Sequence, residues 1–101
     1  EACTIDAPLV SDSEAKILLL ELDGWVIESV SGINQLIKTY KFSNYAESLD
    51  FSNKVADLAE SEDHHPKIVL EYGSVEVSWW SHKIKGLHKN DFICAAKTDL
   101  I

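Results

Sequence analysis

Hydrophobic and polar positions along the chain change from a helix-like pattern to a strand-like one and back. Ser11 or Ser13 can cap a first helix that runs through the sequence EAKILLLELDG and stops at Gly24. Residues 25–31 and 33–42 are rich in β-branched and aromatic side chains, and a glycine separates the two runs. We therefore expect a helix followed by a hairpin of two strands.

A second helical pattern begins at Ser43 and ends near Glu62. Its apolar positions recur at the intervals of an amphipathic helix; they are Tyr45, Leu49, Val55, Leu58 and Ala59. Pro66 prevents the helix from continuing and introduces a second pair of β-rich runs, 67–72 and 75–80. Residues 90–101 then predict a last helix.

The predicted order is helix, two strands, helix, two strands, helix. Two hairpins with interspersed helices favour an α+β fold, in which helices pack on one face of a four-stranded, mainly antiparallel sheet. A chain of 101 residues can bury a modest core but is too short for two such cores. We expect residues 1–101 to form a single domain.

Charge and cysteine content narrow the classes of protein that fit. Seventeen acidic residues against nine basic ones give a formal net charge of −8, which disfavours direct binding to nucleic acid or to an anionic membrane. The longest apolar runs are far too short to span a membrane. Cys3 and Cys94 make no disulfide framework, and Cys94 is expected to be a buried, unreactive thiol. These features indicate a reducing compartment, the cytoplasm or the nucleus.

Three of the four histidines lie in the segment 59–82. If Gly73-Ser74 is a two-residue turn, Tyr72 pairs with Val75, and continuing this register places His65 opposite His82. The register also divides the hairpin into an apolar face and a less apolar face. The less apolar face carries Val69, Glu71, Glu76, Ser78, Trp80 and His82. We expect the histidines to gather there.

The spacing of these histidines predicts acid/base chemistry. Glu60 lies four residues before His64, so its carboxylate can orient and charge that imidazole and make His64 the proton donor. His82 has no acidic neighbour in sequence and is the expected base, although Asp91 or Glu76 could approach it in space. Two imidazoles of different proton affinity can move protons near neutral pH without a metal. Beside the flat wall of Trp79 and Trp80, this arrangement favours proton transfer on a planar heterocycle.

The same residues resemble the pterin-4a-carbinolamine dehydratase family, also known as the dimerisation cofactor of a hepatic homeodomain transcription factor. The family pattern is an acid, three spacers, His-His-Pro, then an aromatic residue, a histidine and an aspartate. In this chain the pattern falls on Glu60, His64, His65, Pro66, Tyr72, His82 and Asp91. The likeness extends over almost the whole chain.

The resemblance implies dehydration of 4a-hydroxytetrahydrobiopterin to quinonoid dihydrobiopterin, without a cofactor or metal. It implies that His64 and His82 are the acid/base pair, that His65 holds the substrate and that Glu60 supports His64, with Asp91 as a further supporting residue. The implied substrate contacts are Asp63, His64, His65, Trp80, Ser81, His82 and Lys83. The sequence departs from the family pattern at Ile68, where many members have tryptophan. It departs again at His88, where members often have serine or threonine, which argues against a capping box with Asp91.

Two other readings remain. The family also implies a binding module, because members form dimers or tetramers and dock a helical segment of a transcription factor. Alternatively, His64, His65 and His82 with a carboxylate could form an open zinc site, but adjacent histidines point apart in an extended chain. Asp91 is also explained as an acid that stabilises the start of a helix.

Overall fold

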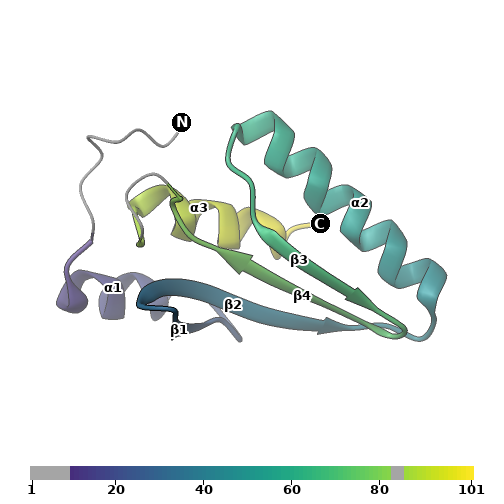
Figure 1. Ribbon diagram of the computed structural model, residues 1–101, viewed down its shortest axis with the longest axis horizontal. Coiled ribbons are helices and arrows are strands. Elements are labelled where there is room, and N and C mark those ends of the chain that lie inside the picture. The colour runs from purple at the N-terminus through teal and green to yellow at the C-terminus, as the bar shows by residue number, and fades with distance from the viewer. Residues whose placement is uncertain (1–9, 83–85) are drawn as a thin grey trace.

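The computed structural model describes residues 10–82 and 86–101 (Figure 1). Its elements follow the predicted order and have these bounds: α1 Asp12–Leu19, β1 Val26–Val30, β2 Ile33–Lys41, α2 Tyr45–Glu62, β3 Lys67–Glu71, β4 Ser74–Trp79 and α3 Lys89–Thr98. Lys83, an expected substrate contact, lies outside the described residues. Within those ranges, no helix is both long and apolar enough to cross a membrane.

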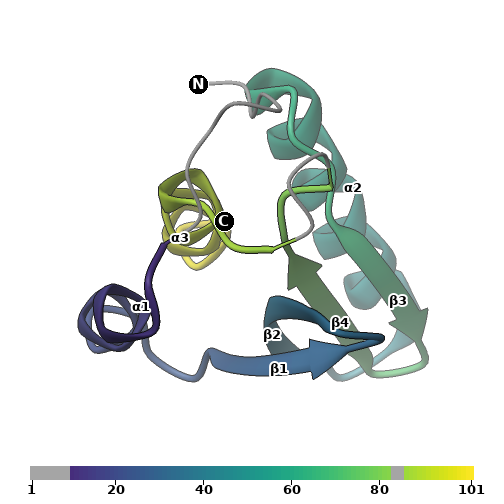
Figure 2. The same ribbon diagram turned by 60° about the vertical axis from the view of Figure 1, so that its left-hand side comes forward.

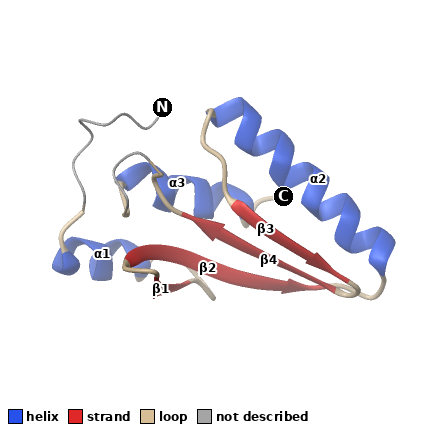
Figure 3. Ribbon diagram, viewed as in Figure 1, coloured by secondary structure: helices blue, strands red, loops and turns tan. Residues whose placement is uncertain are grey.

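The four strands form one antiparallel sheet in the order β1-β2-β4-β3. The helices α2 and α3 lie on one face of this sheet, and α1 lies at one end, beside α3 and away from α2 (Figures 2 and 3). Val75, Val77 and Trp79 of the central strand β4 are fully buried beneath the two helices. The α+β fold expected from the sequence is confirmed.

The first helix is shorter than the sequence predicts. Ser11 caps it by accepting a hydrogen bond from the backbone N–H of Glu14 at 3.1 Å, but the helix ends at Leu19 rather than at Gly24. Beyond Leu19 the backbone continues in tighter turns, and Leu20 is 86% exposed. Leu22 packs against the core without a further helical turn.

The register of the second hairpin differs from the expected one by two residues. Val75 pairs with Leu70 rather than with Tyr72, so the turn is Tyr72-Gly73 and not Gly73-Ser74. Gly73 has a left-handed φ of 78°, and its carbonyl accepts a hydrogen bond from the N–H of Phe42 at 2.8 Å. A shift of two residues keeps every strand side chain on its expected face. It does remove the direct pairing of His65 with His82.

The carboxylate of Asp99 ties the end of α3 to the sheet. It accepts hydrogen bonds from the buried indole N–H of Trp25 at 3.1 Å, from Lys38 Nζ at 2.9 Å and from the hydroxyl of Tyr40. Burial and the hydrogen bond to Asp99 raise the pKa of Tyr40, so its hydroxyl remains a donor at ordinary pH. This cluster of Trp25, Lys38, Tyr40 and Asp99 was not foreseen from the sequence.

Replacing Asp99 by alanine is expected to lower the free energy of unfolding by about 1–3 kcal/mol, because the buried Trp25 N–H loses its acceptor. Urea denaturation measures the change. Asp57→Ala, at an exposed position of α2, is the control and should change stability by less than about 0.5 kcal/mol. Equal effects of the two substitutions would show that the Asp99 contacts contribute no stability.

Cys94 is fully buried, as the sequence predicts. Burial, aided by the negative charges of Glu62 and Asp91, raises the pKa of its thiol to about 12. A thiol that stays protonated and inaccessible is a poor nucleophile, so Cys94 is a packing residue in this fold.

Candidate active site

The C-terminal end of α2 determines where the first histidine lies. Asp63 follows the helix with a left-handed φ of 51°, and its N–H bonds to the carbonyl of Glu60. The N–H of His64 bonds to the carbonyl of Ala59 at 3.1 Å, which completes a Schellman-type helix end. This turn directs His64 away from the surface of α2 and toward the protein interior.

His64 is buried, with 4% of its surface exposed. Its ring stacks on Trp79, with centroids 5.5 Å apart and planes 13° apart, and its Nε2 lies 2.5 Å from Oδ1 of Asp91. The expectation that His64 lies on the less apolar face is therefore wrong. His64 precedes β3, which begins at Lys67, so strand alternation does not determine its direction.

Asp91 has no exposed surface and lies in the first turn of α3. Besides His64, its carboxylate accepts hydrogen bonds at Oδ2 from Ser81 Oγ and from the backbone N–H of His88, each at 2.8 Å. A carboxylate oxygen only accepts, so the proton between Asp91 and His64 lies on Nε2 of the imidazole. Asp91 thus fixes both the orientation and the tautomer of the His64 ring, as the aspartate of a catalytic triad does.

The expectation that His88 argues against a capping box with Asp91 is wrong. His88 is the N-cap of α3, and its Nδ1 accepts the N–H of Asn90 at 3.1 Å while Asp91 accepts the N–H of His88. The imidazole nitrogen takes the place of the usual hydroxyl oxygen. The spacing of His88 and Asp91 could have revealed this box if histidine had been considered as a cap.

Glu60 contacts His65 rather than His64. Its Oε2 lies 2.6 Å from Nε2 of His65, and both side chains are exposed. The expected contact with His64 required α2 to continue for one more turn, but the left-handed residue Asp63 ends the helix first. Asp91 takes the place beside His64 that the sequence had suggested for Glu60.

His82 lies at the exposed side of the same region. Its Nε2 donates a hydrogen bond to the backbone carbonyl of His65 at 2.9 Å, and its ring lies 4.4 Å from the ring of Trp80, centroid to centroid. Because Nε2 carries the proton, Nδ1 of the neutral ring is a hydrogen-bond acceptor. His65 and His82 therefore meet as expected, but through a carbonyl group and not as partners in the strand ladder.

Most of the expected site residues are held together by these contacts. Two neighbouring groups result, one of His64, Asp91 and Ser81 and the other of Glu60, His65 and His82. Chain neighbours connect them, since His64 precedes His65 and Ser81 precedes His82. Within residues 10–82 and 86–101, neither group forms a hydrogen bond or ion pair with Glu76.

The alternative of a metal site receives no support from the described part of the chain. In that part, no cluster of three or more His, Cys, Asp or Glu side chains is arranged to hold a metal ion. His64 and His65 bind different carboxylates, Asp91 and Glu60 respectively. Instead, each of these imidazoles has one ring nitrogen in a hydrogen bond or ion pair.

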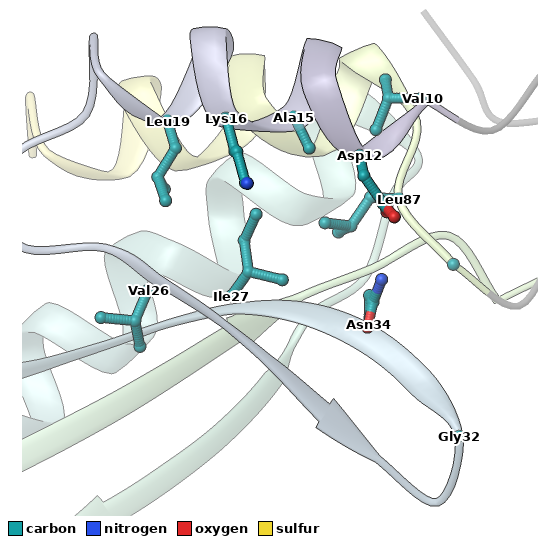
Figure 4. A pocket seen from close by; sticks show the side chains of 11 residues that line it. Val10, Asp12, Ala15, Lys16, Leu19, Val26, Ile27, Gly32, Asn34 and Leu87 are labelled. Atoms are coloured by element: carbon teal, nitrogen blue, oxygen red, sulfur yellow. The ribbon is translucent and has the colours of Figure 1, made fainter.

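A cavity of about 660 Å³ lies elsewhere, between α1 and the β1-β2 hairpin (Figure 4). Its floor is apolar, and Asp12, Lys16 and Asn34 point into it from opposite walls. No imidazole lines it. We therefore place the candidate active site at the histidines and not in this cavity.

A family model described as pterin 4 alpha carbinolamine dehydratase matches residues 8–101. The chain belongs to this family. A protein of Saccharophagus degradans that bears the name pterin-4-alpha-carbinolamine dehydratase by assignment is 59% identical over 99 residues, which are 98% of this chain and 88% of that protein. One of Vibrio vulnificus is 59% identical over the whole chain and 92% of its own length.

The fold of this chain also agrees with that of a solved structure. A protein of Brucella melitensis, described as a transcriptional coactivator/pterin dehydratase, superposes with a TM-score of 0.82 at 29% identity. The superposition covers 92% of this chain and 97% of that one. The family resemblance noted in the sequence is thereby confirmed.

Proposed function

We propose that this protein is a 4a-hydroxytetrahydrobiopterin dehydratase that recycles tetrahydrobiopterin by histidine general acid/base catalysis. Relatives named as pterin-4-alpha-carbinolamine dehydratases align with this chain over nearly their full length. The proposal is supported by two imidazoles in neighbouring groups of the site, His64 and His82, each of which has Nε2 engaged in a hydrogen bond. Such rings have Nδ1 available for proton transfer.

The reaction needs one proton delivered and one removed. The C4a–O bond breaks as the hydroxyl group accepts a proton and leaves as water. The proton on the adjacent N5 is removed, and its bonding electrons form the C4a=N5 double bond of the quinonoid dihydropterin. No oxidant or reductant takes part, so two imidazoles of opposite protonation state suffice.

In this mechanism His64 delivers the proton to the leaving hydroxyl. Its Nε2–H is held by Asp91, so the proton that moves is the one on Nδ1 of the imidazolium. The ring is clamped between the Asp91 carboxylate and the face of Trp79, and only 4% of the residue surface is exposed. The substrate therefore meets one edge of a fixed ring, which favours a single geometry of proton transfer.

His82 removes the proton from N5 of the pterin. The backbone carbonyl of His65 holds the proton on Nε2 of His82, which directs the lone pair of the neutral ring to Nδ1. Trp80, half-buried beside His82, provides an apolar face against which the planar pterin can stack. His65, paired with Glu60, is exposed and holds the substrate.

Asp63 and Lys83 complete the proposed substrate contacts, whereas Ser81, an expected contact, is fully buried and is linked to the site by its hydrogen bond to Asp91. Asp63 is an exposed carboxylate in a left-handed conformation that glycine adopts more easily. Replacing it by glycine is expected to leave the free energy of unfolding unchanged or raise it by up to about 1 kcal/mol. The same change should raise KM by about two- to tenfold, the value of one lost hydrogen bond.

Urea denaturation and steady-state kinetics on Asp63→Gly test both parts of that prediction. Asp63→Asn keeps the size of the side chain and separates loss of charge from loss of contact. An unchanged KM in both variants would show that Asp63 does not contact the substrate.

The function itself is tested by adding purified protein to freshly generated 4a-carbinolamine and following formation of the quinonoid product. The protein should accelerate dehydration well above the uncatalysed rate, and His65→Ala should raise KM more than it lowers kcat. Wild-type protein that is folded but gives no acceleration would refute the proposal.

A second candidate is a non-enzymatic dimerisation cofactor that binds a helix of a transcription factor. It is favoured by the name of the Brucella melitensis relative, which describes a transcriptional coactivator as well as a dehydratase. Val26 and Val30 of β1 are 48% and 41% exposed and offer an apolar surface for another chain. In this role the protein forms dimers or tetramers and works in the nucleus as well as in the cytoplasm. A pull-down with an amphipathic helical peptide, together with size-exclusion chromatography, tests it, and a monomer that retains no helix would exclude it.

A further inference from the structure

His88 occupies a position that the proposed mechanism does not use. It is half-buried at the N-cap of α3, and it makes the two reciprocal contacts of the capping box with the first turn of that helix. Its Nδ1 accepts the N–H of Asn90 at 3.1 Å, and its own N–H donates to Oδ2 of Asp91 at 2.8 Å. His88 therefore determines where the first turn of α3 begins.

Only the neutral ring of His88 can form this cap. The first contact requires a lone pair on Nδ1, and the imidazolium form carries protons on both nitrogens. A protonated ring would also place positive charge at the helix N-terminus, where the helix dipole disfavours it. Histidine is the side chain whose charge ordinarily changes between about pH 5 and 8. A serine or threonine cap has no such dependence.

The cap of α3 is connected to His64 through one carboxylate group. Oδ2 of Asp91 is held by the N–H of His88 and by Ser81 Oγ, and Oδ1 of the same group faces Nε2 of His64 at 2.5 Å. Asp91 is fully buried, so no water-exposed rotamer competes with this arrangement. A shift in the first turn of α3 changes the position of Oδ1 and hence the orientation of the His64 ring.

We propose that His88 is a positioning residue for the acid/base site, and that its neutral form holds Asp91 in the position that orients His64. The proposal rests on the proposed function for its effect on catalysis, but its effect on the His64 ring is independent of any activity. Protonation of His88 loosens the start of α3 and lowers the fraction of molecules in which His64 is aligned.

Two titratable side chains are linked to this cap by hydrogen bonds in the described residues, Asp91 and, through it, His64. Asp91 on α3 faces the backbone of His88, and His64 at the end of α2 lies on the other oxygen of the same carboxylate. Lys89 follows His88 and is exposed, and Ser81 after β4 does not titrate. His64 shares the Asp91 carboxylate with the cap, so its response must be separated experimentally from that of His88.

The variants His88→Ser and His88→Ala separate the effect of the helix cap from the effect of the imidazole ring. Serine supplies a cap at every pH, whereas alanine supplies none. At pH 8 we expect His88→Ala to lower kcat by about tenfold with little change in KM, in line with the cost of a small misplacement. His88→Ser should retain the wild-type kcat at pH 8 and keep a larger share of it at pH 5.5 than wild type does. Lys89→Ala is the neighbouring control and should follow wild type throughout.

The second readout is the NMR signal of the His64 Nε2 proton, which the short contact with Asp91 should shift downfield. The signal should be present in wild type and His88→Ser at pH 8 and weakened or shifted in His88→Ala. On acidification wild type should lose it at a higher pH than His88→Ser does, which separates the response of His88 from that of His64.

The proposal is overturned if His88→Ala matches wild type in both kcat and the His64 signal, or if wild type and His88→Ser respond identically to pH. An inactive wild type with the expected NMR differences would refute the proposed function and leave this inference standing.

Discussion

Replacing His82 by alanine is expected to lower kcat for dehydration of the 4a-carbinolamine by about 10²- to 10⁴-fold, the usual contribution of a positioned general base. The Nδ1 atom of His82 is the acceptor for the N5 proton in the proposed mechanism, and the exposed position of His82 leaves room for the pterin. Steady-state kinetics with a range of substrate concentrations measures the effect. KM should change much less than kcat.

The variant Lys41→Ala is the control for this experiment. Lys41 is exposed at the end of β2 that pairs with Ser74, next to the hairpin turn and away from the end of β4 that leads to the site. It should retain wild-type kinetics. A His82→Ala protein that is folded and keeps more than about a tenth of the wild-type kcat would show that His82 is not the general base.

Replacing Asp91 by asparagine is expected to affect catalysis and stability together. The amide keeps the size of the carboxylate but has a single acceptor oxygen. When this oxygen accepts from the N–H of His88 and from Ser81, the NH₂ group faces His64 and cannot accept its Nε2–H, so the ring changes tautomer or rotates. We expect kcat to fall by about 10²- to 10⁴-fold, as when the orienting aspartate of a catalytic triad is replaced. We expect the free energy of unfolding to fall by about 1–3 kcal/mol, because a buried network loses an acceptor.

Ser81→Ala separates the two effects of Asp91. It removes one donor to Oδ2 and leaves the contact between Oδ1 and His64 intact. Stability should fall by about 1 kcal/mol, with a loss of kcat far smaller than that of Asp91→Asn. If Ser81→Ala lowered kcat as much as Asp91→Asn does, the role of Asp91 would be general packing and not orientation of His64.

Local signals in the sequence were sufficient for the order of elements. Pro66 and the apolar stripe of α2 act within a few residues, and helices and strands respond to them directly. Local signals did not determine the register of the β3-β4 hairpin. A turn at Gly73-Ser74 and one at Tyr72-Gly73 give the same alternation of faces, so the hydrophobic pattern fits both. The contact of Phe42 N–H with the Gly73 carbonyl, which accompanies the observed turn, comes from the residue that follows strand β2.

The sequence proposed the members of the candidate site, but it did not predict which of them form hydrogen bonds with one another. The rule that residues four apart face each other on a helix assigned Glu60 to His64, and it fails because Asp63 leaves the helical conformation. Asp91 reaches His64 from 27 residues later in the chain, through the packing of α3 against the sheet and α2. No local pattern encodes that approach.

The pH dependence of kcat/KM tests the assignment of His64 as acid and His82 as base most directly. A general base must be deprotonated and a general acid protonated, so the wild-type profile should fall on both sides of a maximum. In proteins that also carry His88→Ser, so that the cap of α3 does not respond to pH, the residual activity of His82→Ala should lose the fall on the acidic side. That of His64→Ala should lose the fall on the alkaline side. Profiles that keep both falls in both variants would contradict the account, because the protons would then be moved by other groups.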